Sequence, residues 1–189
     1  ISAYVRHDLR TYQMPDTLLN RGVASEYYNK HTNNNLYIGG QIKRSANNNL
    51  SFGANAESVI LGTYAGDFSL DGNLQYRFPL LNKFAIVGAN ARMSNLTPSY
   101  YYNHFHSTYC WWDLDLKREF VTRLEGNIEI EKTNTKMWVG VENKTNYTYL
   151  TNIGTGYTED GAILPTYNVK AYQHSGSIQI LSANLQQNF

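Results

Sequence analysis

The segment from Cys110 to Glu131 alternates apolar and charged residues over 22 positions. One parity carries apolar residues such as Trp112, Leu124 and Ile128, and the other carries mainly Asp, Glu, Lys and Arg. Successive side chains of a β-strand point to opposite faces, so this spacing predicts one strand with two different surroundings. At about 3.3 Å per residue the strand would be about 70 Å long. Globular strands usually have about 3–10 residues, so the pattern favours a barrel wall that extends beyond a membrane.

The same period of two recurs along the chain. In "DGNLQYRFPLL", which begins at Asp71, the polar parity ends at Arg77, and the other parity carries Leu74, Tyr76 and Phe78. Comparable segments predict about nine strands, with breaks at "QMPDTLLN" and "HTNNN". Short connections ("SANNN", "LLNK", "KTNT") alternate with longer ones ("LGTYAGD", "SNLTPSYYYNHFHS" and residues 151–166). Short turns at one rim and long loops at the other are typical of outer-membrane barrels.

The composition agrees with a β-protein whose surface is not wholly aqueous. Charged residues make up 16% of the chain, against about 25% in typical soluble domains. The mean hydropathy of -0.49 is compatible with a barrel, because only alternate residues of each strand face lipid. No apolar run approaches the ~20 residues of a membrane helix. The net charge of +1 argues against a nucleic-acid partner.

We therefore predict an all-β fold, an antiparallel transmembrane β-barrel in which residues 1–189 form a single region. The side chains that share the parity of Leu74 are expected to face membrane lipid, and those that share the parity of Arg77 are expected to face a wet lumen. The predicted pore-lining residues are the charged members of the luminal parity: Asp71, Arg77, Arg92, Asp113, Asp115, Lys117, Arg123, Glu125, Glu129, Glu142 and Lys144. Because acidic and basic groups are mixed, strong ion selectivity is not expected.

Several stretches resemble the putative-porin family of Bacteroides-type bacteria. The resemblance rests on "GNLQYRFPLLNKFAIVGANARMSNLTPSYYYNHFHS", "WWDLDLKREFVTRLEGNIEI", "VGVENKTNYTYL" and "QHSGSIQILSANLQQNF", in this order, and covers about residues 61–189. It implies an outer-membrane β-barrel that passes solutes, without a catalytic motif to carry over. Members of that family are several times longer than this chain, so the resemblance also implies an internal piece of a larger barrel.

Catalytic and metal sites find little support in the sequence. The carboxylates from Asp113 to Glu131 lie on one strand face, whereas the two carboxylates of a glycosidase face each other across a cleft. We therefore expect no enzyme activity and no cofactor. His104 and His106 are two residues apart and could chelate a metal ion, but no third ligand is evident from the sequence, so none is predicted.

The long loop carries four aromatic residues: Tyr100, Tyr101, Tyr102 and Phe105. Exposed rings there could stack on sugars or contact a partner from the extracellular side. The favoured interpretation is an aromatic belt, or a loop folded over the barrel mouth.

The sequence thus predicts a porin-like channel of the bacterial outer membrane for passive diffusion of small polar solutes. The alternative is a plugged or partnered barrel that acts as a receptor, an adhesin or a subunit of an envelope complex. A homo-oligomer or other outer-membrane proteins are the expected protein partners. A soluble β-sandwich lectin is a third, less favoured interpretation.

Overall fold

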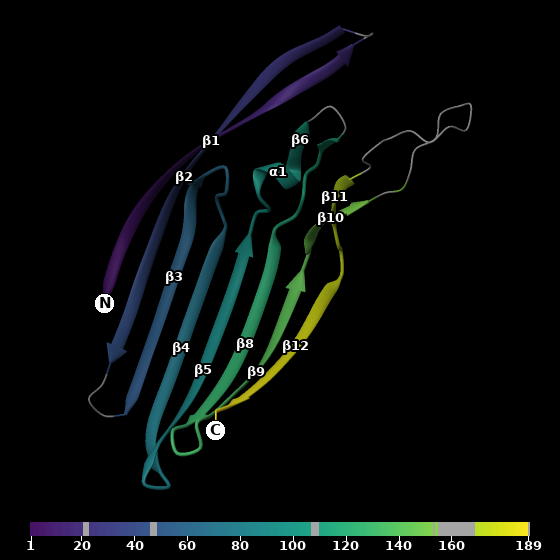
Figure 1. The fold of residues 1–189 in the computed structure, drawn as a ribbon. Coiled ribbons are helices and arrows are strands. Elements are labelled where there is room, and N and C mark those ends of the chain that lie inside the picture. Colours follow the sequence, from purple (N-terminus) through teal and green to yellow (C-terminus); the bar gives the residue numbers. More distant parts are fainter. Residues whose placement is uncertain (21–22, 46–48, 107–109, 153, 155–168, 189) are drawn as a thin grey trace.

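The computed structural model describes residues 1–20, 23–45, 49–106, 110–152, 154 and 169–188. Most of them belong to one antiparallel sheet of eight strands (Figure 1). In sheet order these are β1 (Ser2–Asn20), β2 (Val23–Ser45), β3 (Leu50–Gly62), β4 (Phe68–Leu80), β5 (Lys83–Leu96), β8 (Glu119–Ile130), β9 (Thr135–Thr145) and β12 (Ser177–Gln187). Two short ribbons pair β6 (His104–His106) with β7 (Trp111–Asp113) and β10 (Thr148–Asn152) with β11 (Val169–Gln173). A single turn of helix, α1 (Tyr100–Asn103), precedes β6.

Short connections lie at one end of the sheet and long connections at the other, as the sequence predicts. Two residues, Leu81 and Asn82, join β4 to β5, and both have positive φ angles (52° and 64°). Positive φ at both central residues is the signature of a type I′ turn, whose twist matches that of paired strands. The long connection from β5 to β8 and the ribbon β10–β11 lie at the opposite end (Figure 1). Most of the third long connection, predicted over residues 151–166, lies outside the described residues.

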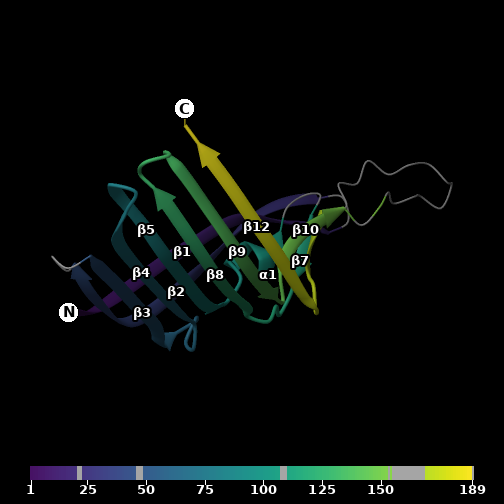
Figure 2. The ribbon, with the colours of Figure 1, turned by 90° about the horizontal axis from the view of Figure 1, so that it is seen from below.

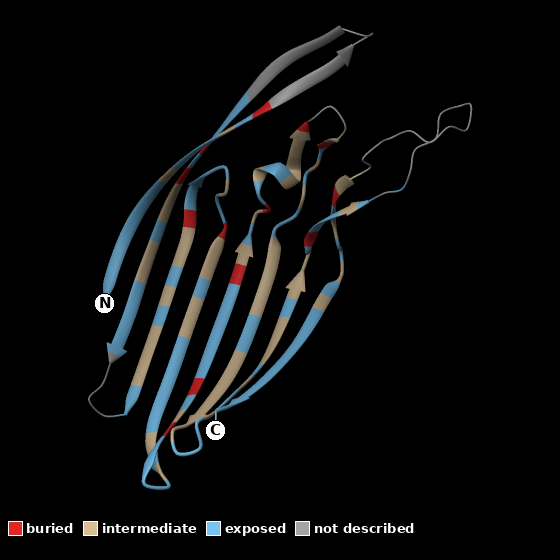
Figure 3. Ribbon diagram, viewed as in Figure 1, coloured by how far each residue is buried: buried red, intermediate tan, exposed pale blue. Residues whose placement is uncertain are grey.

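The strand register keeps the two parities apart across the whole sheet. Leu74 on β4 pairs with Phe52 on β3 and with Ala89 on β5, so apolar residues form continuous rows. These side chains are largely exposed: Leu74 by 47%, Leu124 by 57% and Leu181 by 77%. Figure 3 shows how sparse the buried positions are along the strands. In the described part of the chain the sheet is therefore a single layer, and neither face is covered along most of its length.

Among the described residues, few hydrophobic side chains are buried: Met14, Val59, Ala85, Trp112 and Ala171. A water-soluble domain buries one face of each sheet in a common core. Here the apolar face instead offers a continuous hydrophobic surface, far larger than the patches that soluble monomers usually expose.

The sheet is open in the described structure. β1 and β12 are its two edges and do not pair with each other within the described residues. Figure 2 shows the strong twist of the sheet, in which β1 crosses behind its neighbours. The all-β antiparallel prediction is confirmed, with eight strands in the main sheet instead of about nine. A closed barrel is not formed by these strands alone.

The prediction of one unbroken strand over residues 110–131 is wrong. The structure divides this segment into β7 and β8, and residues 114–118 between them are not in a strand. Their backbone groups find other partners, because Leu114 N donates to Asn103 O (2.6 Å) and Leu116 N donates to the Asn103 side chain (2.9 Å). The alternating sequence pattern continues through a segment that local hydrogen bonds hold away from the sheet.

The predicted breaks at "QMPDTLLN" and "HTNNN" are also wrong, since β1 and β2 run through them. Tertiary contacts explain why β2 continues through "HTNNN". Asn33 and Asn35 are buried, Asn33 Nδ2 donates to Tyr64 Oη (2.7 Å), and the Asn35 side chain accepts from Tyr64 N (2.9 Å). Pro15 is compatible with β1 because an edge strand has one side on which an N–H is not required.

Within the described residues, no helix is both long and apolar enough to cross a membrane.

Candidate functional site

A polar row crosses the sheet from β2 to β9. The register aligns its members in the order Gln41, Asn55, Asp71, Arg92, Arg123 and Glu142. Five strand pairs place these side chains on one face, because register and parity are preserved from strand to strand. Three of the predicted pore-lining residues of β4, β5 and β8 are thus direct neighbours. Two more, Glu142 and Lys144, follow on β9.

Opposite charges are paired within this polar face. Arg92 Nε contacts Asp71 Oδ1 at 2.5 Å. The guanidinium of Arg123 contacts Glu125 at 2.7 Å and Glu142 at 3.3 Å. Arg92 and Arg123 are directly opposite each other, and their mutual repulsion is offset because each has its own carboxylate. The polar face therefore carries a dense set of charges with little local excess of either sign.

The other predicted pore-lining residues of the eight-stranded sheet also make ion pairs. Lys144 Nζ contacts Glu142 at 2.9 Å, and Glu129 contacts Lys136 at 2.7 Å. Arg77 reaches across β5 to Glu131 at 2.9 Å. These exposed pairs add little stability, about 0–1 kcal/mol each, so their effect is mainly on the local field.

Sequence reasoning missed several members of this face at its β1 edge. Arg6 on β1 reaches across β2 to Glu57 on β3 at 2.7 Å, and Tyr4 Oη donates to the same carboxylate at 3.0 Å. The intervening residue, Gly39, leaves room for the Tyr4 ring, which lies where a Cβ at Gly39 would be. The parity of β1 could have identified Arg6, but only the register shows that it meets Glu57.

Each face of the twisted sheet is hollowed. The hollow on the polar face has a volume of about 490 Å³ and is lined by side chains such as Lys43, Asn73, Asn90 and Glu125. The hollow on the other face has a volume of about 860 Å³ and is lined largely by apolar side chains, including Ile42, Leu70, Met93, Leu124 and Val141. The two faces thus present one surface suited to hydrated solutes and one suited to hydrocarbon.

The long connection between β5 and β8 folds against the polar side of the β1–β2 hairpin. Tyr100 stacks on Tyr12 and on His31, with ring centroids 4.6 Å apart in both pairs. Tyr12 and His31 are cross-strand partners of the same parity as Arg6. The base of the connection is fixed by the buried Asp67, which accepts from Thr97 N (2.8 Å) and from Arg118 Nε (2.9 Å).

Of the four aromatic residues predicted as loop contacts, Tyr100, Tyr101 and Phe105 make ring contacts with their surroundings. Tyr101 meets Tyr12 edge to face at 5.5 Å, and Phe105 stacks on Trp112 at 4.8 Å. Tyr102 is half-buried. This packing matches a loop folded over the polar face better than a set of freely exposed rings.

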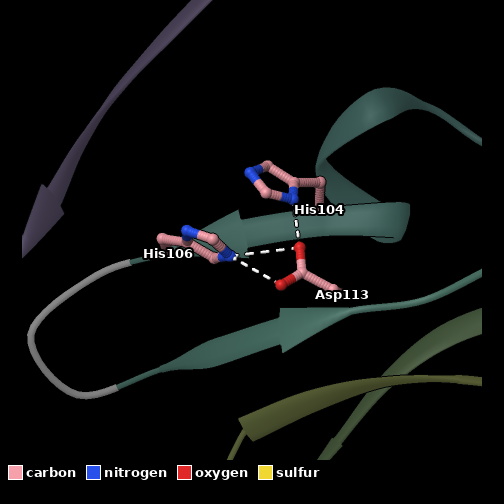
Figure 4. Close-up of side chains that lie close together, drawn as sticks. All are labelled: His104, His106 and Asp113. Atoms are coloured by element: carbon pink, nitrogen blue, oxygen red, sulfur yellow. Dashed lines mark hydrogen bonds and ion pairs between the residues drawn. The ribbon is translucent and has the colours of Figure 1, made fainter. Parts of the chain in front are cut away.

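Three predicted pore-lining residues do not lie on the eight-stranded wall. Asp115 and Lys117 belong to the irregular segment 114–118, and the Lys117 backbone hydrogen-bonds the Gln173 side chain. Asp113 lies on β7, where its carboxylate meets the rings of His104 and His106 (Figure 4). The physical reason is the break described above, which separates β7 from β8.

The structure places a third metal-ligating side chain, that of Asp113, beside the two histidines. The sequence alone did not reveal this third ligand. Partial burial alone would raise the pKa of Asp113, but the hydrogen bond from His106 and the nearby charge of His104 outweigh it and lower that pKa. The Asp113 carboxylate is therefore ionised at neutral pH and can accept from an imidazole or bind a cation.

A comparison with known families agrees with this architecture. The chain matches the family described as putative porin over residues 1–189. No curated protein and no solved structure matches the chain. A match over its whole length, together with the antiparallel sheet of alternating faces, shows that the chain belongs to the putative-porin family.

Proposed function

We propose that this chain forms part of the wall of an outer-membrane channel through which small polar solutes diffuse passively. The observation that carries the proposal is the division of the eight-stranded sheet into one exposed apolar face and one charged face. A single layer with these two faces is stable where hydrocarbon lies on one side and water on the other. Solute passage of this kind involves no catalytic step and no cofactor.

The dimensions of the apolar face support a position in the bilayer. On β4 the apolar parity extends from Phe68 to Leu80, thirteen residues. At about 3.3 Å per residue and a strand tilt of about 40°, this corresponds to about 33 Å along the membrane normal, more than the band has to cover. The apolar band of outer-membrane barrels is about 25 Å tall. Tyr76 and Phe78 stack at 5.9 Å near the short turns, where an aromatic girdle is expected.

The charged face supports passage of polar solutes with weak ion selectivity. In the row from Asp71 to Glu142 two guanidinium groups lie between two carboxylates, so a passing ion meets both signs within a short distance. The aromatic connection over the β1 edge would narrow the opening without adding charge of one sign. In this arrangement the long connections face outward and the short turns face the periplasm.

Conductance in planar bilayers tests the proposal. Stable, stepwise openings of the purified protein with a ratio of cation to anion permeability near unity are expected. A barrel that inserts into the bilayer but stays silent and co-purifies with a fixed partner would instead favour the plugged receptor or envelope subunit. Extraction from cells without detergent would contradict membrane embedding altogether.

A further inference from the structure

The ribbon β6–β7 brings three metal-ligand side chains together on one of its faces. His104 and His106 are two residues apart on β6, so both point to the same side. Asp113 on β7 is the cross-strand partner of His104 and shares that side. The other face of the ribbon carries Phe105 and Trp112, which are stacked on each other.

The donor atoms already converge on one point. His106 Nε2 lies 3.0 Å from Asp113 Oδ2, and His104 Nδ1 is in direct contact with Asp113 Oδ1. All three ligand atoms lie within 4.8 Å of one another. Around a tetrahedral zinc ion, with bonds of about 2.0–2.2 Å, neighbouring ligand atoms are about 3.3 Å apart. Figure 4 shows the three side chains pointing toward one another. Small side-chain rotations would therefore bring their ligand atoms to the spacing of a zinc site.

We propose that His104, His106 and Asp113 form a binding site for a divalent transition-metal ion, with Zn²⁺ as the best match. Two imidazole nitrogens and one carboxylate oxygen suit zinc and its first-row neighbours, whereas calcium and magnesium prefer all-oxygen sites. This site lies outside the eight-stranded sheet and does not depend on the proposed channel function.

The surroundings of the site favour a preformed arrangement. The ring of Trp112 is buried, and its Nε1 donates to the carbonyl oxygens of Tyr101 (3.2 Å) and Tyr102 (3.1 Å). His106 is 6% exposed, and its backbone N–H contacts Met14 Sδ. The Asp113 side chain is 57% exposed, which leaves room for water or a further ligand to complete the coordination.

The position of the ribbon gives the metal a structural consequence. The ribbon packs against the β1–β2 hairpin through Met14, and the preceding α1 packs against it through Tyr12 and His31. A bound ion would tie β6 to β7 and so stabilise the connection that lies over the polar face.

The expected affinity is moderate. Among the described residues Nε2 of His104 is buried without a hydrogen-bond partner, so none of them orients this ring from behind. Such outer partners typically contribute 10- to 100-fold in metal affinity. We therefore expect a dissociation constant for Zn²⁺ on the order of micromolar, not nanomolar.

Calorimetric titration of the chelator-treated, folded protein in detergent micelles tests the site with Zn²⁺ as the probe. The unsubstituted protein should bind one equivalent. His104→Ala and Asp113→Asn should each weaken binding at least about tenfold, since a direct ligand is worth no less than an outer partner. The matched control is His174→Ala, an exposed histidine outside the cluster, which should leave the affinity unchanged. Heat-modified gel mobility verifies that each variant is folded.

Nitrogen coupling in the electron paramagnetic resonance spectrum of the Cu²⁺-loaded protein gives a second, independent measurement. Two coupled imidazole nitrogens are expected, and one should be lost in His104→Ala. The proposal is overturned if no saturable one-to-one binding occurs, or if Asp113→Asn and His104→Ala bind Zn²⁺ as tightly as the unsubstituted protein. Equal displacement of Zn²⁺ by Ca²⁺ would also overturn it, because it would show an oxygen site elsewhere.

Discussion

Arginine at Leu74 should impair membrane assembly far more than arginine at the next residue, Asn73. Leu74 is the seventh of the thirteen residues from Phe68 to Leu80, so it lies at the middle of the strand, about 12 Å from either edge of an apolar band about 25 Å tall. That distance is greater than an arginine side chain can bridge by extending towards the interface. A lipid-facing arginine at the midplane costs about 2–4 kcal/mol.

The expected change in the folded fraction follows from this energy. A cost of 2–4 kcal/mol lowers the equilibrium constant for folding roughly 30- to 700-fold. Asn73 is exposed on the opposite, polar face, where Asn73→Arg should change the free energy of folding by less than about 0.5 kcal/mol. Leu124→Arg on β8 provides a second lipid-facing test, since Leu124 belongs to the apolar face and is 57% exposed.

Equilibrium unfolding by urea in phospholipid vesicles, followed by gel mobility of the unheated protein, measures these differences. Leu74→Arg and Leu124→Arg should shift the midpoint to much lower urea concentrations, and Asn73→Arg should not. If Leu74→Arg and Asn73→Arg unfold at the same urea concentration, the assignment of the two faces is wrong.

Three further predictions concern backbone strain, the connection over the polar face, and the charged row. Gly62 has φ +112°, and a Cβ there would lie 1.9 Å from Asn34 O, so Gly62→Ala should cost at least about 2 kcal/mol in the same urea assay. At Gly72 no atom lies within 4 Å of the added Cβ, so Gly72→Ala should be neutral or slightly stabilising, and equal losses in both variants would contradict the strained turn. Asp67→Ala should leave Thr97 N and Arg118 Nε without their acceptor, so amide exchange in residues 97–106 and 110–118 should rise while β8 stays protected. Unchanged exchange would show that Asp67 does not fix the connection. Replacing Arg92 and Arg123 together by Gln removes two positive charges from the polar row, so the reversal potential in a salt gradient should shift towards cation selectivity, and an unchanged potential would place this face outside the conduction path.

The period-two pattern by itself determined the class of fold and the division of the sheet into two faces. Whether a side chain of a strand points to one face or the other depends only on its place along that strand. Leu74 and Arg77 could therefore be assigned to opposite faces before any strand pairing was known. The two-residue turn at Leu81 and Asn82 was equally local, because "LLNK" interrupts two alternating segments.

Contacts between distant residues decided what the pattern could not. Residues 114–118 continue the alternation of β8, yet their backbone N–H groups donate to the side chains of Asn103 and Gln173, which hold this segment away from the sheet. The "HTNNN" stretch has the composition of a turn, but Tyr64, about 30 residues away, hydrogen-bonds one atom of the Asn33 amide and one of the Asn35 amide inside a strand. A buried hydrogen bond is worth about 1 kcal/mol, as much as the whole range of strand preferences, so tertiary contacts can override the local preference.

The histidine cluster shows the same limit at a functional level. The spacing of His104 and His106 was visible in the sequence, and it placed both rings on one side of a strand. Asp113 could not be joined to them, because its alternation assigned it to the long strand of the sheet wall. Only the pairing of β6 with β7 sets Asp113 opposite His104, since register between strands is fixed by the whole fold and not by the residues next to one another in the chain.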